Sequence, residues 1–81
     1  MIYSLLTLMD GTEYTYTELR SDGIIVYVET PDAVDGFHSL ECVLPGIIVR
    51  NVQGYTLQEQ KEILDIIKTH AEYICDTATN K

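Results

Sequence analysis

Two pairs of residues in this chain carry side chains that bind metals: His38 with Cys42, and His70 with Cys75. Four residues along a strand span about 13 Å, which is too far for two ligands of one zinc ion. Residues five apart on a helix point about 140° away from each other. We therefore expect no metal site and no cofactor, and we expect both cysteines to be free thiols.

The acidic residues form no pattern that predicts catalysis. Acid–base catalysis needs carboxyl groups that converge in a cleft and have shifted pKa values, whereas the acids here are spread over expected turns, a loop and a helix. The sequence contains no Ser-His-Asp arrangement, no glycine-rich phosphate loop and no H-E-x-x-H motif. We expect the protein not to be an enzyme, and we name no catalytic residue.

Two Asp-Gly pairs set the expected register of the first three strands. Asp10-Gly11 follows the apolar run 2–9, and Asp22-Gly23 precedes the run 24–30. An Asp-Gly pair between strand-like runs favours a two-residue type I′ turn, whose two central residues both need positive φ. Side chains alternate along a strand, so the length of each turn decides which residues share a face of the sheet.

Two-residue turns would place Leu5 opposite Tyr16 and Leu19 opposite Val26. One face is then expected to be aliphatic, and it carries Ile2, Leu6, Leu8, Leu19, Ile24, Val26 and Val28. The other face is expected to be rich in tyrosine and acid. The predicted residues of a protein-binding site on that face are Tyr3, Tyr14, Tyr16, Glu18, Tyr27 and Glu29.

A tyrosine-rich sheet face has two interpretations. Tyrosine suits interfaces because its large, rigid ring supplies contact area and a hydroxyl group. Tyrosine also has a high β-propensity and forms stabilising cross-strand pairs without binding anything. The sequence leaves both interpretations open.

The charge of the chain is strongly acidic. Thirteen acidic residues oppose five basic ones, so the net charge is −8 and the pI is about 4.3. Direct binding to nucleic acid needs Lys and Arg for the phosphates, so we expect none. The charge suits a basic protein partner, such as a nuclease, a toxin or a nucleic-acid-binding protein, although acidity also serves simply to keep proteins dispersed.

The sequence predicts one α+β domain over residues 1–81, an antiparallel meander of four to five strands with one C-terminal helix on one sheet face. A loop is expected over 30–37, because Pro31 lacks a backbone donor and turn-forming residues follow it. No run of about 18 apolar residues could span a membrane, and the N-terminus lacks the basic start of a signal peptide, so we expect a cytoplasmic protein. The predicted strands cover 2–9, 12–19, 24–30, 38–44 and 47–52.

The helix is predicted over 57–75, followed by a frayed tail over 76–81. Thr56 and Glu59 have the spacing of a capping box, which marks a helix start. The residues expected to pack on the sheet share one helix face and are Leu57, Ile63, Leu64, Ile67, Ala71, Ile74 and Cys75.

Two stretches of the sequence, LLTLMDGTE and CVLPGIIVRNVQGYTLQEQKEI, resemble small uncharacterised proteins of gut Firmicutes, some of them carried on mobile elements. The resemblance covers about half of the chain and contains no functional motif, so it implies no site residue. It implies a bacterial, cytoplasmic setting. In kind, such small acidic proteins are similar to anti-CRISPR proteins and antitoxins.

Our leading hypothesis is a non-catalytic, acidic protein-binding module that engages a basic partner. In its most specific form it is a nucleic-acid-mimic inhibitor, anti-CRISPR-like, or an antitoxin of a mobile element, with carboxylates standing where phosphates normally bind. The alternative is a structural homo-oligomer, in the simplest case a homodimer, that pairs with itself through the tyrosine-rich sheet face.

Overall fold

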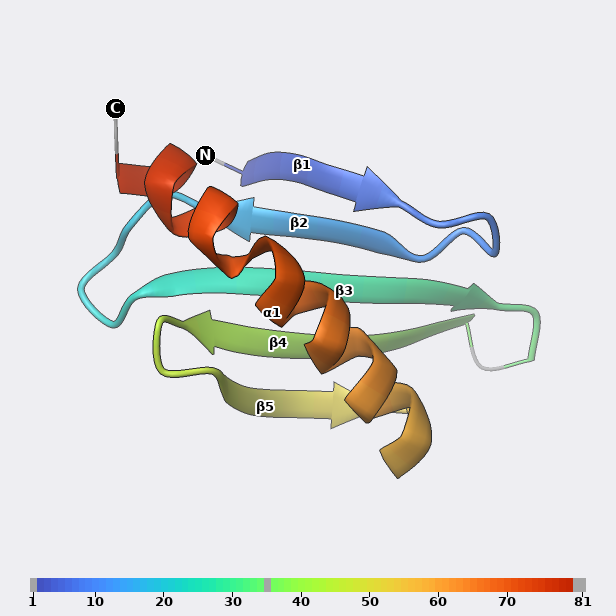
Figure 1. The fold of residues 1–81 in the computed structure, drawn as a ribbon. Coiled ribbons are helices and arrows are strands. Elements are labelled where there is room, and N and C mark those ends of the chain that lie inside the picture. Colours follow the sequence, from blue (N-terminus) through green and yellow to red (C-terminus); the bar gives the residue numbers. More distant parts are fainter. Residues whose placement is uncertain (1, 35, 80–81) are drawn as a thin grey trace.

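The computed structural model describes residues 2–34 and 36–79, and this part of the chain has the predicted α+β fold (Figure 1). Five strands form one antiparallel sheet in the order β1-β2-β3-β4-β5, so each strand pairs with its neighbour in the sequence. One helix follows. The elements are β1 (Ile2–Thr7), β2 (Glu13–Thr17), β3 (Ile24–Asp32), β4 (Gly36–Leu44), β5 (Ile48–Gln53) and α1 (Leu57–Thr79).

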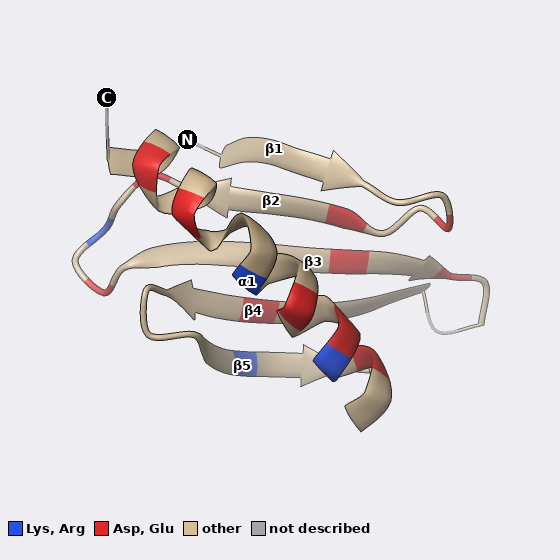
Figure 2. Ribbon diagram, in the orientation of Figure 1, with Lys and Arg blue, Asp and Glu red and all other residues tan. Residues whose placement is uncertain are grey.

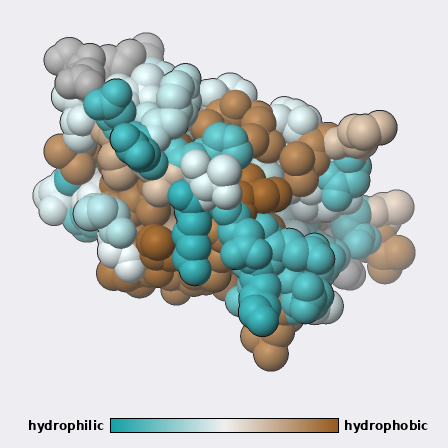
Figure 3. All heavy atoms as spheres, viewed as in Figure 1, coloured by the Kyte–Doolittle hydropathy of each residue, from teal (hydrophilic) through white to brown (hydrophobic). Residues whose placement is uncertain are grey.

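Helix α1 lies across one face of the sheet and crosses the strands diagonally (Figure 1). It starts beside β5 and ends near the β1 and β2 side. Hydrophilic side chains follow the outward side of the helix, and hydrophobic side chains emerge on both sides of it (Figure 3). Within the described residues, no helix is both long enough and apolar enough to cross a membrane.

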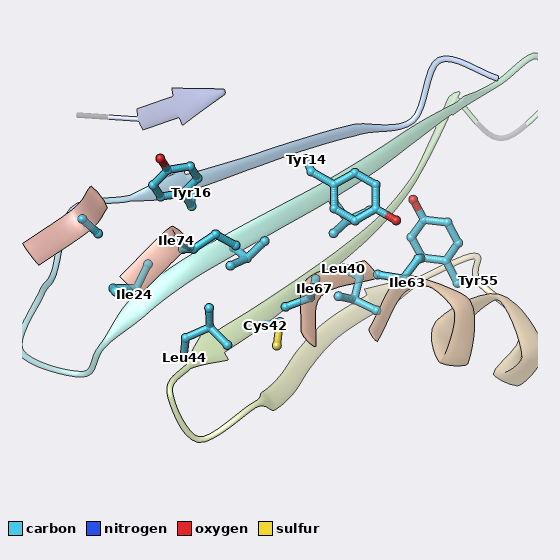
Figure 4. Close-up of a cluster of buried hydrophobic side chains, with 13 residues drawn as sticks. Tyr14, Tyr16, Ile24, Leu40, Cys42, Leu44, Tyr55, Ile63, Ile67 and Ile74 are labelled. Carbon is cyan, nitrogen blue, oxygen red and sulfur yellow. The ribbon is translucent and has the colours of Figure 1, made fainter. Parts of the chain in front are cut away.

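The core lies between the sheet and α1. Alternate residues of β3 and β4 point toward the helix, as the sequence predicted, and the helix meets them with Ile63, Ile67 and Ile74 (Figure 4). Full burial of one such aliphatic side chain contributes about 1.5–3 kcal/mol. The core side chains from these two strands are Ile24, Val26, Val28, Leu40, Cys42 and Leu44.

The start of α1 has the predicted capping box. The Thr56 N–H donates to Glu59 Oε1 at 2.9 Å, and the Glu59 N–H donates to Thr56 Oγ1 at 3.1 Å. Leu57 was expected in the core, and this is wrong, because its side chain is 80% exposed. The diagonal course of the helix places its first turn beside β5, the last strand of the sheet (Figure 1).

The helix is longer than predicted and ends at Thr79 rather than at residue 75. Ala78 is buried in the core, and this contact holds the last turn in place. The prediction of a frayed tail is therefore wrong for residues 76–79, and residues 80–81 lie outside the described part of the chain.

The loop expected over 30–37 is mostly strand. Pro31 pairs with Phe37 across β3 and β4, and Asp32 pairs with Gly36. The last β2 partner of β3 is Glu29, so Pro31 lies where β3 has a neighbour on only one side. A proline is tolerated at such an edge because its missing N–H has no ladder bond to make there.

Candidate protein-binding face of the sheet

The first Asp-Gly pair does not form the predicted two-residue turn. The Leu8 N–H donates to the Thr12 carbonyl oxygen at 2.8 Å, and the Gly11 N–H donates to the Leu8 carbonyl oxygen at 3.0 Å. These bonds enclose a loop of three residues that ends at Gly11, whose φ is 91°. Three-residue hairpin loops place a residue with positive φ at this third position, and glycine adopts it without strain.

The second Asp-Gly pair is also shifted from its expected place. Arg20 and Gly23 exchange both backbone hydrogen bonds, at 2.9 and 3.0 Å, so the two loop residues are Ser21 and Asp22. Gly23 closes the turn with a φ of 120°. A Cβ atom at Gly23 would lie 2.3 Å from the Leu44 carbonyl oxygen, so this position also needs the small size of glycine.

The register between β2 and β3 decides which side chains of β2 face the helix. Tyr16 pairs with Val26, and Tyr14 pairs with Val28, so both tyrosines share the core face with these valines. Tyr14 is 1% exposed and Tyr16 is 2% exposed. The prediction that they lie on the face away from the helix is wrong. Three residues of the β2 side (17–19) but only two of β3 (24–25) separate the Arg20–Gly23 pair from the Tyr16–Val26 pair, and one extra residue turns a strand over.

The first residues of β1, 2–4, are turned over together with β2, whereas Leu6 packs against the core as predicted. Tyr3 pairs with Tyr16, and their ring centroids lie 5.4 Å apart on the helix side. A bulge between Ser4 and Leu6 then changes the register, and Leu6 lies opposite Tyr14. Tyr3 is therefore also misplaced in the sequence-based site. Three residues expected in the core are instead substantially exposed: Ile2, Leu8 and Leu19.

Tyr27 and Glu29 lie on the face that α1 leaves uncovered, as expected. Tyr27 alternates with the core residues Val26 and Val28, and its cross-strand neighbours are Thr15 and Glu41. Glu18 follows the end of β2, and its Oε1 lies 3.7 Å from Arg20 Nε. Of the six predicted site residues, the uncovered face keeps Tyr27 and Glu29.

A shallow groove of about 380 Å³ crosses this uncovered face over β3, β4 and β5. A bulge in β5 forms one side of it, because Asn51 and Val52 stand between the pairs Glu41–Arg50 and Ser39–Gln53. Asn51 has a φ of 54°, a conformation that asparagine adopts more readily than most residues. The polar and aromatic residues of the groove are Tyr27, Glu29, Ser39, Glu41, Asn51 and Gln53.

Two carboxylates stand directly beside each other next to this groove. Glu13 of β2 pairs with Glu29 of β3, and both side chains are exposed. The acidic positions of these two strands are red in Figure 2. Like charges directly opposite each other destabilise a sheet. Among the residues that the structure describes, no Lys or Arg forms an ion pair with either glutamate. Glu41 differs, because Arg50 Nε lies 3.0 Å from its Oε1.

The other end of the uncovered face is apolar. Ile25 pairs with Val43, and both are buried although α1 lies on the opposite side of the sheet. Ile48 pairs with Val43 and is 60% exposed, and Ile2 lies at the same end on β1 and is 57% exposed. The face therefore combines an apolar end with an acidic, tyrosine-containing groove.

No family model, curated protein or solved structure matches this chain. The resemblance to small proteins of gut Firmicutes therefore stays a prediction. Within residues 2–34 and 36–79, no three His, Cys, Asp or Glu side chains lie close enough together to hold a metal ion.

Sequence reasoning missed Glu13 and Glu41 as members of this surface. Glu41 lies on the uncovered face through the alternation of β4, opposite Tyr27. Glu13 reaches that face because one extra residue over 17–19 turns β2 over.

Proposed function

We propose that this protein is a non-catalytic binding module that engages a basic protein through the uncovered face of its sheet. The observation that carries the proposal is the cross-strand pair of Glu13 and Glu29. This pair places two like charges side by side without a described basic neighbour, and a cationic partner would relieve their repulsion.

The groove beside this pair suits Arg or Lys side chains of such a partner. The Tyr27 ring offers a flat aromatic surface to a cation, and Glu29 and Glu41 offer acceptor oxygens. Ser39, Asn51 and Gln53 supply further acceptors, since hydroxyl and amide oxygens both accept hydrogen bonds. A net charge of −8 would in addition attract a basic partner from a distance.

Replacing Glu29 by Gln tests the proposal, because it should change stability and binding in opposite directions. Removing the repulsion from Glu13 should stabilise the fold by about 0.2–1 kcal/mol. Binding to an Arg-rich peptide should weaken by about two- to fivefold, since exposed charges contribute modestly to affinity. Urea unfolding and NMR titration with the peptide measure the two effects.

A matched control is Glu72→Gln, which removes one exposed carboxylate from the outward side of α1. The peptide should bind Glu72→Gln as it binds the wild type, and its chemical-shift changes should centre on Tyr27 and Glu29. Equal loss of binding in both variants would show that the net charge alone attracts the peptide. No shift changes on the uncovered face would contradict the proposal.

The more specific form of the proposal is an inhibitor that occupies the nucleic-acid site of its partner. If the protein occupies the nucleic-acid site of a nuclease or toxin, an added oligonucleotide should displace it from that partner. If it binds elsewhere on the partner, the three components should form a ternary complex. Size-exclusion chromatography of the three components distinguishes the two arrangements.

Self-pairing is the second candidate, and the exposed Ile2 and Ile48 at the apolar end favour it. The charge opposes it, because two copies would bring their acidic residues together. We expect a monomer at micromolar concentration by sedimentation equilibrium. A dimer that strengthens with added salt, and that Ile48→Glu abolishes, would instead support self-pairing.

A further inference from the structure

A second hollow lies on the opposite side of the sheet, between the β1–β2 loop and the first turns of α1. Its volume is about 130 Å³. At about 30 Å³ for each water-sized group, this is room for about four such groups. The polar side chains that line it include Asp10, Thr12, Tyr14, Tyr55, Glu59 and Glu62.

Three hydroxyl groups form a chain along this hollow. Thr12 Oγ1 lies 2.7 Å from Thr30 Oγ1, and Thr30 Oγ1 lies 2.7 Å from Tyr55 Oη. Hydroxyl groups can each donate one hydrogen bond and accept others, so the chain can turn its protons away from a bound donor. The hollow therefore has an adaptable row of acceptors.

Tyr14 brings a further hydroxyl group to the hollow. Its side chain is 1% exposed, and no residue that the structure describes hydrogen-bonds its hydroxyl group. Among the described residues no fully buried side-chain N or O atom lacks a partner, so this hydroxyl group is open to the hollow and not sealed in the core. The Tyr14 hydroxyl is turned toward that of Tyr55 (Figure 4), and both residues line the hollow. An acceptor oxygen with no partner in the fold thus faces the space where a ligand would bind.

The charge of the hollow is negative. Asp10 Oδ1 accepts the Thr12 N–H at 2.9 Å, and Glu59 Oε1 accepts the Thr56 N–H at 2.9 Å. Each of these carboxylates has a second oxygen, and Glu62 adds a third carboxylate. The described lining contains no Lys or Arg. The hydrogen bond from Thr12 holds the pKa of Asp10 below its usual value, so this group is charged at neutral pH.

We propose that this hollow binds the ammonium group of an aliphatic amine. An ammonium group carries three donors and no acceptor, which matches a hollow whose free polar atoms are acceptors. The three carboxylates attract its positive charge, and the apolar side chains of Leu8, Ile63 and Ile66 would contact the attached methylene groups. This site is separate from the uncovered face, because it lies on the helix side of the sheet.

The test is an NMR titration with 1,4-diaminobutane at neutral pH, with 1,4-butanediol as the uncharged probe of the same length. The diamine should shift the methyl signals of Leu8, Ile63 and Ile66 and should saturate at about 1 mM or below. The diol should leave these signals unchanged. Nα-acetyl-lysine amide is a third probe. If this compound alone binds, the natural ligand of the hollow is the side chain of a lysine residue.

Tyr14→Phe removes only the hydroxyl group without a partner, so it should leave the fold intact and weaken diamine binding by about tenfold. Tyr73→Phe is the matched control at an exposed helix position and should bind like the wild type. Unchanged affinity in Tyr14→Phe, an equal response to the diol, or shifts confined to Glu13 and Glu29 would overturn the proposal.

Discussion

At the scale of single residues, the side chain of Thr17 links β2 to β3 where the backbone pairing of the two strands ends. Its hydroxyl oxygen accepts the Ile25 N–H at 3.2 Å and donates to the Glu18 carbonyl oxygen at 2.9 Å. The β2–β3 register runs only as far as Tyr16 and Val26, so Thr17 continues the link between the strands beyond it. The residue is fully buried, and its two hydrogen bonds satisfy both its own hydroxyl group and the Ile25 N–H.

Replacing Thr17 by Val keeps the shape of the side chain and leaves the Ile25 N–H without its acceptor. We expect a loss of about 1–3 kcal/mol in the free energy of unfolding. Thr15→Val is the control, because Thr15 lies on the uncovered face and should change stability by under about 0.5 kcal/mol. Urea unfolding midpoints of the two variants measure the difference, and equal midpoints would contradict the structural role of the hydroxyl.

Tyr14 makes the stability depend on pH in the alkaline range. Burial raises its pKa to about 12, and the nearby Tyr55, Asp10 and Glu62 add to the shift. An unfolded tyrosine has a pKa of about 10, so the folded state holds the proton more tightly. The contribution is complete below about pH 10 and is lost as the pH rises to about 12.

We therefore expect urea midpoints to fall between about pH 9 and about pH 11, by the equivalent of about 1–2 kcal/mol. Tyr14→Phe should show a smaller fall, with a remainder from Tyr55, whose pKa burial also raises. Tyr73→Phe, at an exposed position, should fall as the wild type does. A fall of the same size in all three proteins would show that the buried Tyr14 is not its source.

At the scale of elements, the sequence correctly predicts the helices and strands that are marked by patterns of neighbouring residues. The capping box fixes the start of α1, and strict alternation fixes the faces of β4, with Leu40, Cys42 and Leu44 toward the core. The predicted face of β2 is wrong because one extra residue lies between the Arg20–Gly23 pair and the Tyr16–Val26 pair. An Asp-Gly pair marks a turn, but it does not show whether a bulge follows in the strand beside it.

The residues of the candidate site are predicted correctly only where the face of their strand is predicted correctly. Tyr27 and Glu29 belong to β3, whose buried alternate residues Val26 and Val28 fix its orientation, so the sequence places them correctly. Tyr14 and Tyr16 belong to β2, where the extra residue over 17–19 decides the face, so the sequence places them on the wrong face. One extra residue beside a strand is enough to move the expected binding residues into the core.

The capping box predicts the effect of a change at the start of α1. Thr56→Ala removes the oxygen that accepts the Glu59 N–H, and we expect a loss of about 0.5–2 kcal/mol in stability. Thr69→Ala is the control within the helix, since its hydroxyl bonds only to the Asp65 carbonyl oxygen and alanine favours the helix. Thermal unfolding should rank Thr56→Ala below Thr69→Ala, and the reverse order would exclude the capping role.

At the scale of the whole molecule, one helix closes the only core that the described residues form. Ile67 lies at its centre and is fully buried. Ile67→Ala should cost about 2–5 kcal/mol, a large part of the stability of so small a domain. Lys68→Ala, at the next position on the exposed side, should cost under about 0.5 kcal/mol. Denaturant midpoints that ranked Lys68→Ala as the more harmful change would contradict the packing of α1.

The order of the strands also has a consequence for how quickly the chain reaches this structure. Every strand pairs with the strand next to it in the sequence. Each pairing therefore closes a short stretch of chain, and short closures carry a small entropic cost. The sheet can grow one hairpin at a time from any point along it, without a search for distant partners. Docking of α1 onto the strands is then the step that brings remote parts of the chain together.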